Sequence, residues 1–117
     1  VSNVDDHLRN HGFLWDGGRG WTLSPAYDLN PTPTDLRPRI LTTCISLDDA
    51  TCDLDLVLSV AAYFGLDDAT ARAIVKAVAT ATAGWREVAA SVEARPAEIR
   101  RMESAFVHDD LARALTL

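Results

Sequence analysis

The densest group of polar side chains lies near the start of the chain. Between Asn3 and Gly12, six of the ten residues are Asn, Asp or His, and a second polar segment, Ser24 to Pro31, carries Asp28. Phosphoryl transfer needs side chains of this kind, because one Asp orients the attacking hydroxyl while an Asn and a later Asp hold Mg²⁺ against phosphates. Mg²⁺ prefers such oxygen ligands. The two segments therefore suggest a phosphotransferase site.

The spacing within these segments makes the suggestion more specific. Asp5 and Asn10 have the Asp-x-x-x-x-Asn spacing of the protein-kinase catalytic loop. Asp28, within Tyr27-Asp28-Leu29, stands in the place of the later metal-binding Asp of the kinase D-F-G motif. A hairpin is predicted between them, and because a hairpin brings its two ends together, we expect Asn10 to lie near Asp28.

Other chemistry remains open for the same residues. Taken singly, each Asp or Asn is more typical of helix capping and Asx turns than of catalysis. A zinc site built from Asp5, His7 and His11 is a further alternative. The six acids between Asp48 and Asp68 lack the spacing and the Gly of a calcium loop, so we interpret them as a solvated edge with helix-capping aspartates.

The elements that would position the site form the N-terminal third of the chain. Aromatic segments around Asp16-Gly17-Gly18-Arg19-Gly20 predict a β-hairpin, with Trp15 and Trp21 packing across the strands. Three prolines exclude regular structure between residues 24 and 33. The β-branched segment from Ile40 to Leu47 predicts one more strand.

From Asp53 onward the apolar period becomes helical. A first helix is expected to end at Gly65, and Asp67 is expected to cap a long second helix that Gly84 interrupts. Short helices are expected over residues 86–94, from Pro96, and after a capping Asp109. The predicted buried face of the long helix consists of Ala71, Ile74, Val75, Val78 and Trp85.

Composition excludes several classes of protein. The chain has 117 residues, 48% hydrophobic and 24% charged, as expected of one globular domain or a fragment of one. Its net charge of −6 argues against broad nucleic-acid binding, and no apolar run is long enough to cross a membrane. Cys44 and Cys52 have no CxxC spacing, so we expect reduced, buried thiols in a cytoplasmic protein.

The motifs N-x-D-D-H-L-R-N-H-G-F and L-S-P-A-Y-D-L-N-P, separated by a hairpin, resemble the C-terminal lobe of HipA-like serine/threonine kinases. The resemblance implies a mainly α fold, a kinase-like C-lobe in which a catalytic loop and hairpin (residues 1–38) precede a helical bundle (residues 39–117). It also implies that Asp5 is the catalytic base, that Asn10 and Asp28 bind Mg²⁺, and that His7 supports the loop. The role of Asp6 is left open.

The same resemblance implies that the full enzyme uses ATP and phosphorylates a protein hydroxyl. It would be the toxin half of a bacterial toxin–antitoxin pair, and its antitoxin partner would be a DNA-binding repressor. The chain contains no Gly-rich phosphate loop, and its only lysine, Lys76, lies in a predicted helix. We therefore expect a fragment of a longer kinase that transfers no phosphate alone.

Two other functions fit parts of the sequence. The first alternative is a non-catalytic helical interaction module. An exposed apolar face would then cause the chain to form homodimers. A small-molecule phosphotransferase is the third interpretation, because such enzymes share the kinase plan of one base and two metal ligands.

Overall fold

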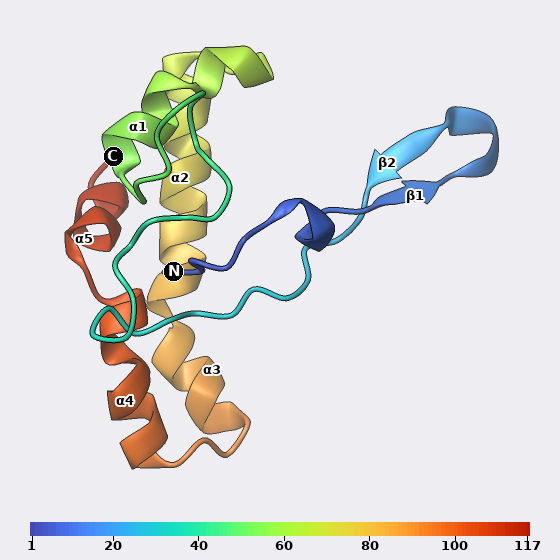
Figure 1. Cartoon of the computed structure of the whole chain (residues 1–117). Helices are drawn as coiled ribbons and strands as arrows, with labels where there is room; N and C mark the ends of the chain where they lie inside the picture. The colour runs from blue at the N-terminus through green and yellow to red at the C-terminus, as the bar shows by residue number, and fades with distance from the viewer.

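The computed structural model describes all 117 residues and consists of a helical body with a projecting β-hairpin (Figure 1). About half of the chain is helical, which confirms the mainly α expectation. The hairpin is formed by β1 (Phe13–Trp15) and β2 (Trp21–Leu23). The body contains five α-helices: α1 (Leu54–Ser59), α2 (Asp68–Ala83), α3 (Trp85–Ser91), α4 (Pro96–Phe106) and α5 (Asp109–Leu115).

The hairpin forms where the aromatic segments predicted it. β1 and β2 are antiparallel, with Phe13 opposite Leu23 and Trp15 opposite Trp21. The two indole rings pack across the strands with centroids 5.4 Å apart, yet every residue of both strands is exposed. The hairpin is therefore held by its own pairing and does not contribute to the core of the body.

The strand predicted from Ile40 to Leu47 is wrong. Only an isolated bridge forms there, between Ile40 and Thr51, and the rest of the segment is loop. A β-branched segment becomes a strand only when another strand satisfies its backbone groups. Here the chain turns back on itself at residues 45–49, through backbone hydrogen bonds from Ile45 and Ser46 to Asp49.

Capping residues define the first two helices of the body. The side chains of Asp53 and Asp67 accept backbone hydrogen bonds from Leu56 at 2.8 Å and from Thr70 at 2.7 Å, respectively. The segment between them is not one continuous helix, because α1 ends at Ser59 and a 3-10 turn covers Ala61–Phe64. Gly65 then terminates the segment in the left-handed conformation, with φ of 70°, as predicted.

The core lies where α1, α2 and α5 meet. Leu54, Ala79 and Ala114 form its buried centre, and Leu58, Val75 and Leu111 pack against them. The predicted face of α2 is partly wrong, because Ile74 and Val78 are exposed. The helices that contact α2 here are α1 and α5, and they bury the narrow stripe of Ala71, Val75 and Ala79.

A second cluster joins α3 to α4 at the other end of α2. The ring of Trp85 stacks on that of Phe106 with centroids 4.4 Å apart, and Ala105 is fully buried beside them. Pro96 occupies the first position of α4, as predicted. The predicted cap of α5 is wrong by one residue: His108 caps the helix through a hydrogen bond from Leu111 N to its Nδ1, and Asp109 lies inside it.

Backbone hydrogen bonds attach the N-terminal segment to the body. Ser2 N donates to Ala105 O at 3.0 Å, and Thr32 N donates to Ser2 O at 2.8 Å. Thr42 and Thr43 add hydroxyl hydrogen bonds to the carbonyl oxygens of Val4 and Asp6. The polar segments of the candidate site are thus held by residues that are distant in sequence.

Both cysteines are free, but the expectation that they are buried is wrong for Cys44, which is exposed in the irregular loop. Cys52 is half-buried, and burial raises the pKa of its thiol. No helix combines the length and apolar character that crossing a membrane requires.

Candidate functional site

The centre of the candidate site is a hydrogen-bonded pair formed by Asn10 and Asp28. Asn10 Nδ2 donates to Asp28 Oδ2 at 2.9 Å, and Asn10 Oδ1 accepts a hydrogen bond from the backbone N–H of His7 at 3.1 Å. Asn10 is buried at the end of the 3-10 turn Leu8–Asn10. Its amide is thus fixed on both sides, by the turn that precedes it and by a residue beyond the hairpin.

The hairpin brings these two residues together as the sequence predicted. Ser24 N donates to Gly12 O at 2.8 Å, which joins the two ends of the hairpin. The hydroxyl of Tyr27 donates to the carbonyl oxygen of Arg9 at 2.8 Å. Gly12 packs against both residues, since a Cβ there would lie 3.4 Å from Ser24 Oγ and 3.6 Å from the hydroxyl of Tyr27, which are ordinary contact distances.

Asp28 has an uncommon backbone conformation. Its φ is 57°, in the left-handed region, which Asp and Asn adopt more readily than other residues with a side chain. The conformation is held by Asn30, whose backbone N–H donates to Asp28 O at 3.1 Å and whose side chain donates to Asp28 Oδ1 at 2.5 Å. Strain of this kind concentrates at functional sites when the surroundings maintain it.

Asp5 forms no hydrogen bond with Asn10 or Asp28. Its side chain is exposed and forms no side-chain hydrogen bond. Asp6 instead pairs with Nε2 of His11 at 3.2 Å. His7 is half-buried, and its Nδ1 is covered from solvent without a hydrogen-bond partner. The structure therefore joins Asn10, Asp28 and the backbone of His7, and leaves Asp5 at the adjacent surface.

Two residues of the site were not identified from the sequence. Asn30 and the hydroxyl of Tyr27 both contribute hydrogen bonds to the segment that carries Asp28. The Asp28-x-Asn30 spacing is typical of an Asx turn and signals the first contact. Nothing local signals the second, because Tyr27 and Arg9 are 18 positions apart.

The oxygen atoms of Asn10 and Asp28 are of the type that Mg²⁺ binds. Asp28 offers a carboxylate and Asn10 an amide carbonyl, and each of these oxygens retains one lone pair beyond the hydrogen bond it accepts. The structure has no group of three or more His, Cys, Asp or Glu side chains that could hold a metal ion, so Asp5, His7 and His11 do not form a zinc-type cluster.

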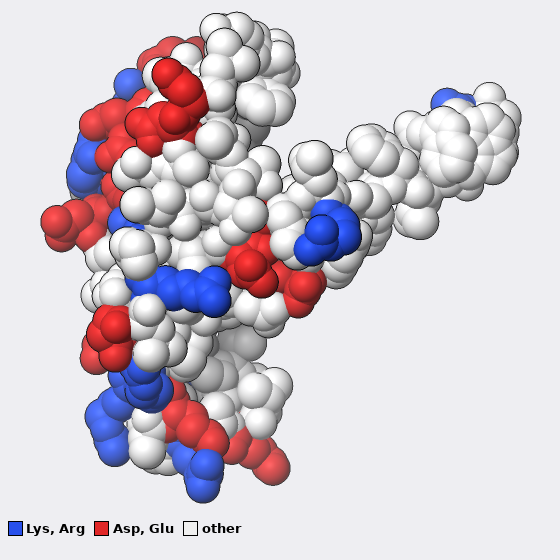
Figure 2. Space-filling model, viewed as in Figure 1, with Lys and Arg blue, Asp and Glu red and all other residues white.

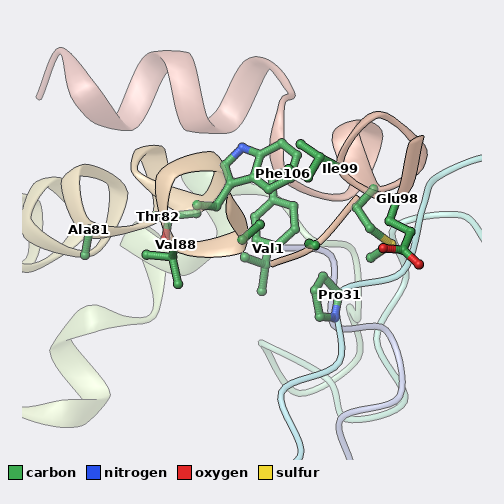
Figure 3. Close-up of a pocket in the computed structure, with 12 residues that line it drawn as sticks. Val1, Pro31, Ala81, Thr82, Val88, Glu98, Ile99 and Phe106 are labelled. Atoms are coloured by element: carbon green, nitrogen blue, oxygen red, sulfur yellow. The ribbon is translucent and has the colours of Figure 1, made fainter. Parts of the chain in front are cut away.

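Two clefts of about 550 and 570 Å³ lie elsewhere, and neither is lined by Asp5, Asn10 or Asp28. Figure 3 shows the first cleft, where Val88, Ile99 and Phe106 of the helical body face Pro31 of the N-terminal segment. The Asn10–Asp28 pair lies outside both clefts.

No curated protein and no solved structure matches the chain in the comparisons. A family model does match: that of the HipA-like C-terminal domain, over residues 1–85. The match includes the polar segment from Asn3 to Gly12, the hairpin, Asp28 and the helices α1 and α2. The chain therefore belongs to the HipA-like C-terminal domain family.

Proposed function

We propose that this chain is the C-lobe of an ATP-dependent serine/threonine protein kinase, the toxin component of a bacterial toxin–antitoxin module. The observation that carries the proposal is the hydrogen bond between Asn10 and Asp28. Phosphoryl transfer of the protein-kinase type uses an Asn and a later Asp at one place, so that both can bind Mg²⁺ next to the nucleotide. Membership of the HipA-like family supports the same function.

Each residue has a separate role in the proposed reaction. Asp5 accepts the proton of the substrate hydroxyl, and its exposed carboxylate suits a residue that must reach a second protein. Asn10 and Asp28 hold Mg²⁺ through oxygen atoms. When bound, the ion neutralises charge on the transferring phosphoryl group. His7 supports the loop by donating its backbone N–H to Asn10.

The proposal includes partners that the 117 residues do not contain. ATP would be bound mainly by another lobe, because this chain has no Gly-rich phosphate loop. The substrate is a protein with an accessible hydroxyl, and the regulating partner is an antitoxin repressor. The proposed location is the cytoplasm.

The test is transfer of radiolabelled phosphate from ATP by the complete gene product. Asp5→Asn is expected to reduce the rate about 100-fold or more, since a positioned base contributes roughly 10²–10⁴-fold. Asp28→Asn is expected to raise the Mg²⁺ concentration needed for half-maximal rate. Residues 1–117 alone are expected to transfer no phosphate.

Asp35→Asn is the matched control, because Asp35 is an exposed Asp of the N-terminal segment that pairs with Arg101 outside the site. It should retain the wild-type rate. Retained activity in Asp5→Asn would contradict a catalytic role for Asp5. A variant that loses activity together with the helical circular-dichroism signal would also contradict it, because the residue would then be needed for folding.

A further inference from the structure

The second cleft lies between the irregular segment that contains residues 29–45 and the helices α1, α2 and α5. Its volume is about 570 Å³, within the range of known ligand sites. Most of its lining is apolar, including Leu29, Leu41, Ile45, Val57, Ile74 and Val78. We propose that this cleft binds a basic, amphipathic peptide segment of a partner protein, a role separate from phosphoryl transfer.

The apolar lining includes side chains that no element of the chain covers. Val78 is 61% exposed, Ile74 is 46% exposed and Val57 is 40% exposed. Ile74 and Val78 are one turn apart on α2, so they form a continuous ridge along the cleft. The ridge lies outside the stripe of α2 that packs into the core. Apolar side chains of a bound segment would therefore bury it.

The charge of the lining determines which segment fits. Three carboxylates, those of Asp6, Asp53 and Asp110, line the cleft with two cationic groups, the guanidinium of Arg39 and the amino group of Val1, which leaves an excess of one negative charge. Arg39 is already paired with Asp110 at 2.8 Å. In Figure 2 the acidic side chains gather over the end of the body that carries α1, next to an uncharged surface. Lysine or arginine beside the inserted apolar side chains would complement this border.

Unpaired polar atoms favour a peptide over a hydrocarbon chain. Three residues of the lining have a buried polar atom without a partner: the acceptor Asn3 Oδ1 and the donors Arg39 Nε and His108 Nε2. A buried unpaired group is unfavourable, and a hydrocarbon cannot pair it. A peptide main chain carries both donors and acceptors, the two kinds of group that these atoms lack. The acidic border also disfavours fatty acids and anionic lipids.

The experiment measures binding of the 117-residue chain to a fluorescent helical peptide with leucine on one face and lysine on the other. Fluorescence anisotropy should show saturable binding that weakens as salt is added. A matched peptide with glutamate in place of lysine should not bind. Saturable binding of the glutamate peptide, or no binding of the lysine peptide, would overturn the proposal.

Two charge variants form a matched pair. Asp53→Asn removes a carboxylate of the cleft and is expected to weaken binding roughly two- to fivefold. Asp67→Asn makes the same change at the cap of α2, outside the cleft, and should have no effect. Asn caps helices as well as Asp does, so both variants should fold. Equal weakening by the two variants would show attraction to net charge alone and would refute the site.

An apolar variant tests the other half of the proposal. Val78→Thr keeps the shape of an exposed side chain and should weaken binding several-fold. Val92→Thr, at the similarly exposed end of α3, should leave binding unchanged. If Val78→Thr binds the lysine peptide as the wild type does, the apolar ridge is not part of the site and the proposal fails.

Discussion

At the scale of single residues, one buried side chain organises the candidate site. Asn10 accepts a hydrogen bond from the residue that begins its own turn and donates one to Asp28 beyond the hairpin. Neither a hydroxyl nor an aliphatic side chain of this size provides both bonds in this geometry. The same amide oxygen is the atom proposed to bind Mg²⁺, so the proposed metal ligand is also a residue that holds the local structure together.

Replacing Asn10 by Ala is expected to lower the free energy of unfolding by about 1–3 kcal/mol, because it leaves the His7 N–H and Asp28 Oδ2 without partners in a partly buried site. Asn30→Ala removes an exposed hydrogen bond to the same carboxylate and should cost less, about 0.5–1.5 kcal/mol. Urea unfolding measures both variants. A larger loss in Asn30→Ala would contradict the central place of Asn10.

At the scale of elements, helix ends depend on local side-chain chemistry. Asp53 and Asp67 cap α1 and α2 through their carboxylates, and the hydrogen bond from the Thr70 N–H holds the pKa of Asp67 below its ordinary value. Gly65 terminates the 3-10 turn that follows α1. These signals span only a few residues, which explains why the sequence predicted them.

Gly65→Ala is expected to destabilise the protein by about 1–2 kcal/mol, because alanine in the left-handed conformation brings Cβ against the following carbonyl. Gly18→Ala is the control, since Gly18 has no positive φ and a Cβ there meets no atom within 4 Å. That variant should be neutral or stabilising. Thermal unfolding distinguishes them, and equal effects would refute the conformational argument.

The cap of α5 should make stability depend on pH. His108 accepts the Leu111 N–H through Nδ1, so it must be neutral, and burial followed by the positive charge of Arg39 lowers its pKa from the ordinary 6.5. Below about pH 6.5 the unfolded chain binds more protons than the folded one. Stability from this residue is therefore complete above that pH and is lost as pH falls through the lowered pKa.

The variant His108→Asn should reduce this pH dependence, because Asn caps a helix without titrating in this range. Urea unfolding at pH 7.5 and pH 5.5, values on either side of about 6.5, measures the effect. His108→Ala lacks any cap and should be less stable than His108→Asn at both values. An unchanged loss of stability on acidification in His108→Asn would show that other groups are responsible.

At the scale of the whole molecule, the hairpin extends from the body as an almost uncharged arm (Figure 2). The strand register places Phe13, Trp15, Trp21 and Leu23 on one face, and all four are exposed. No other part of the chain covers this face. Asn10 and Asp28 flank the hairpin in the sequence and are hydrogen-bonded at its base. The candidate site therefore lies where the arm joins the helical body.

This face should make the isolated chain associate with itself. Aromatic side chains bury large areas, and exposed apolar patches of this kind promote contacts between molecules. We expect the apparent mass from light scattering to rise with concentration, and the double variant Trp15→Ser and Trp21→Ser to remain monomeric. Leu47→Ser changes a single, fully exposed apolar residue of the body and should behave as the wild type. Association that persists in the double tryptophan variant would place the contact elsewhere.

The sequence by itself determined the features that depend on neighbouring residues: the hairpin, the caps at Asp53 and Asp67, the break at Gly84 and the start of α4 at Pro96. It also predicted the contact of Asn10 with Asp28, because a hairpin necessarily joins its two ends. Only the tertiary structure decided that residues 40–47 form no strand, that Ile74 and Val78 are exposed, and that Asp5 is exposed and forms no hydrogen bond with Asn10 or Asp28. Strand pairing, burial and side-chain contact depend on which distant segments meet, and no local pattern specifies those partners.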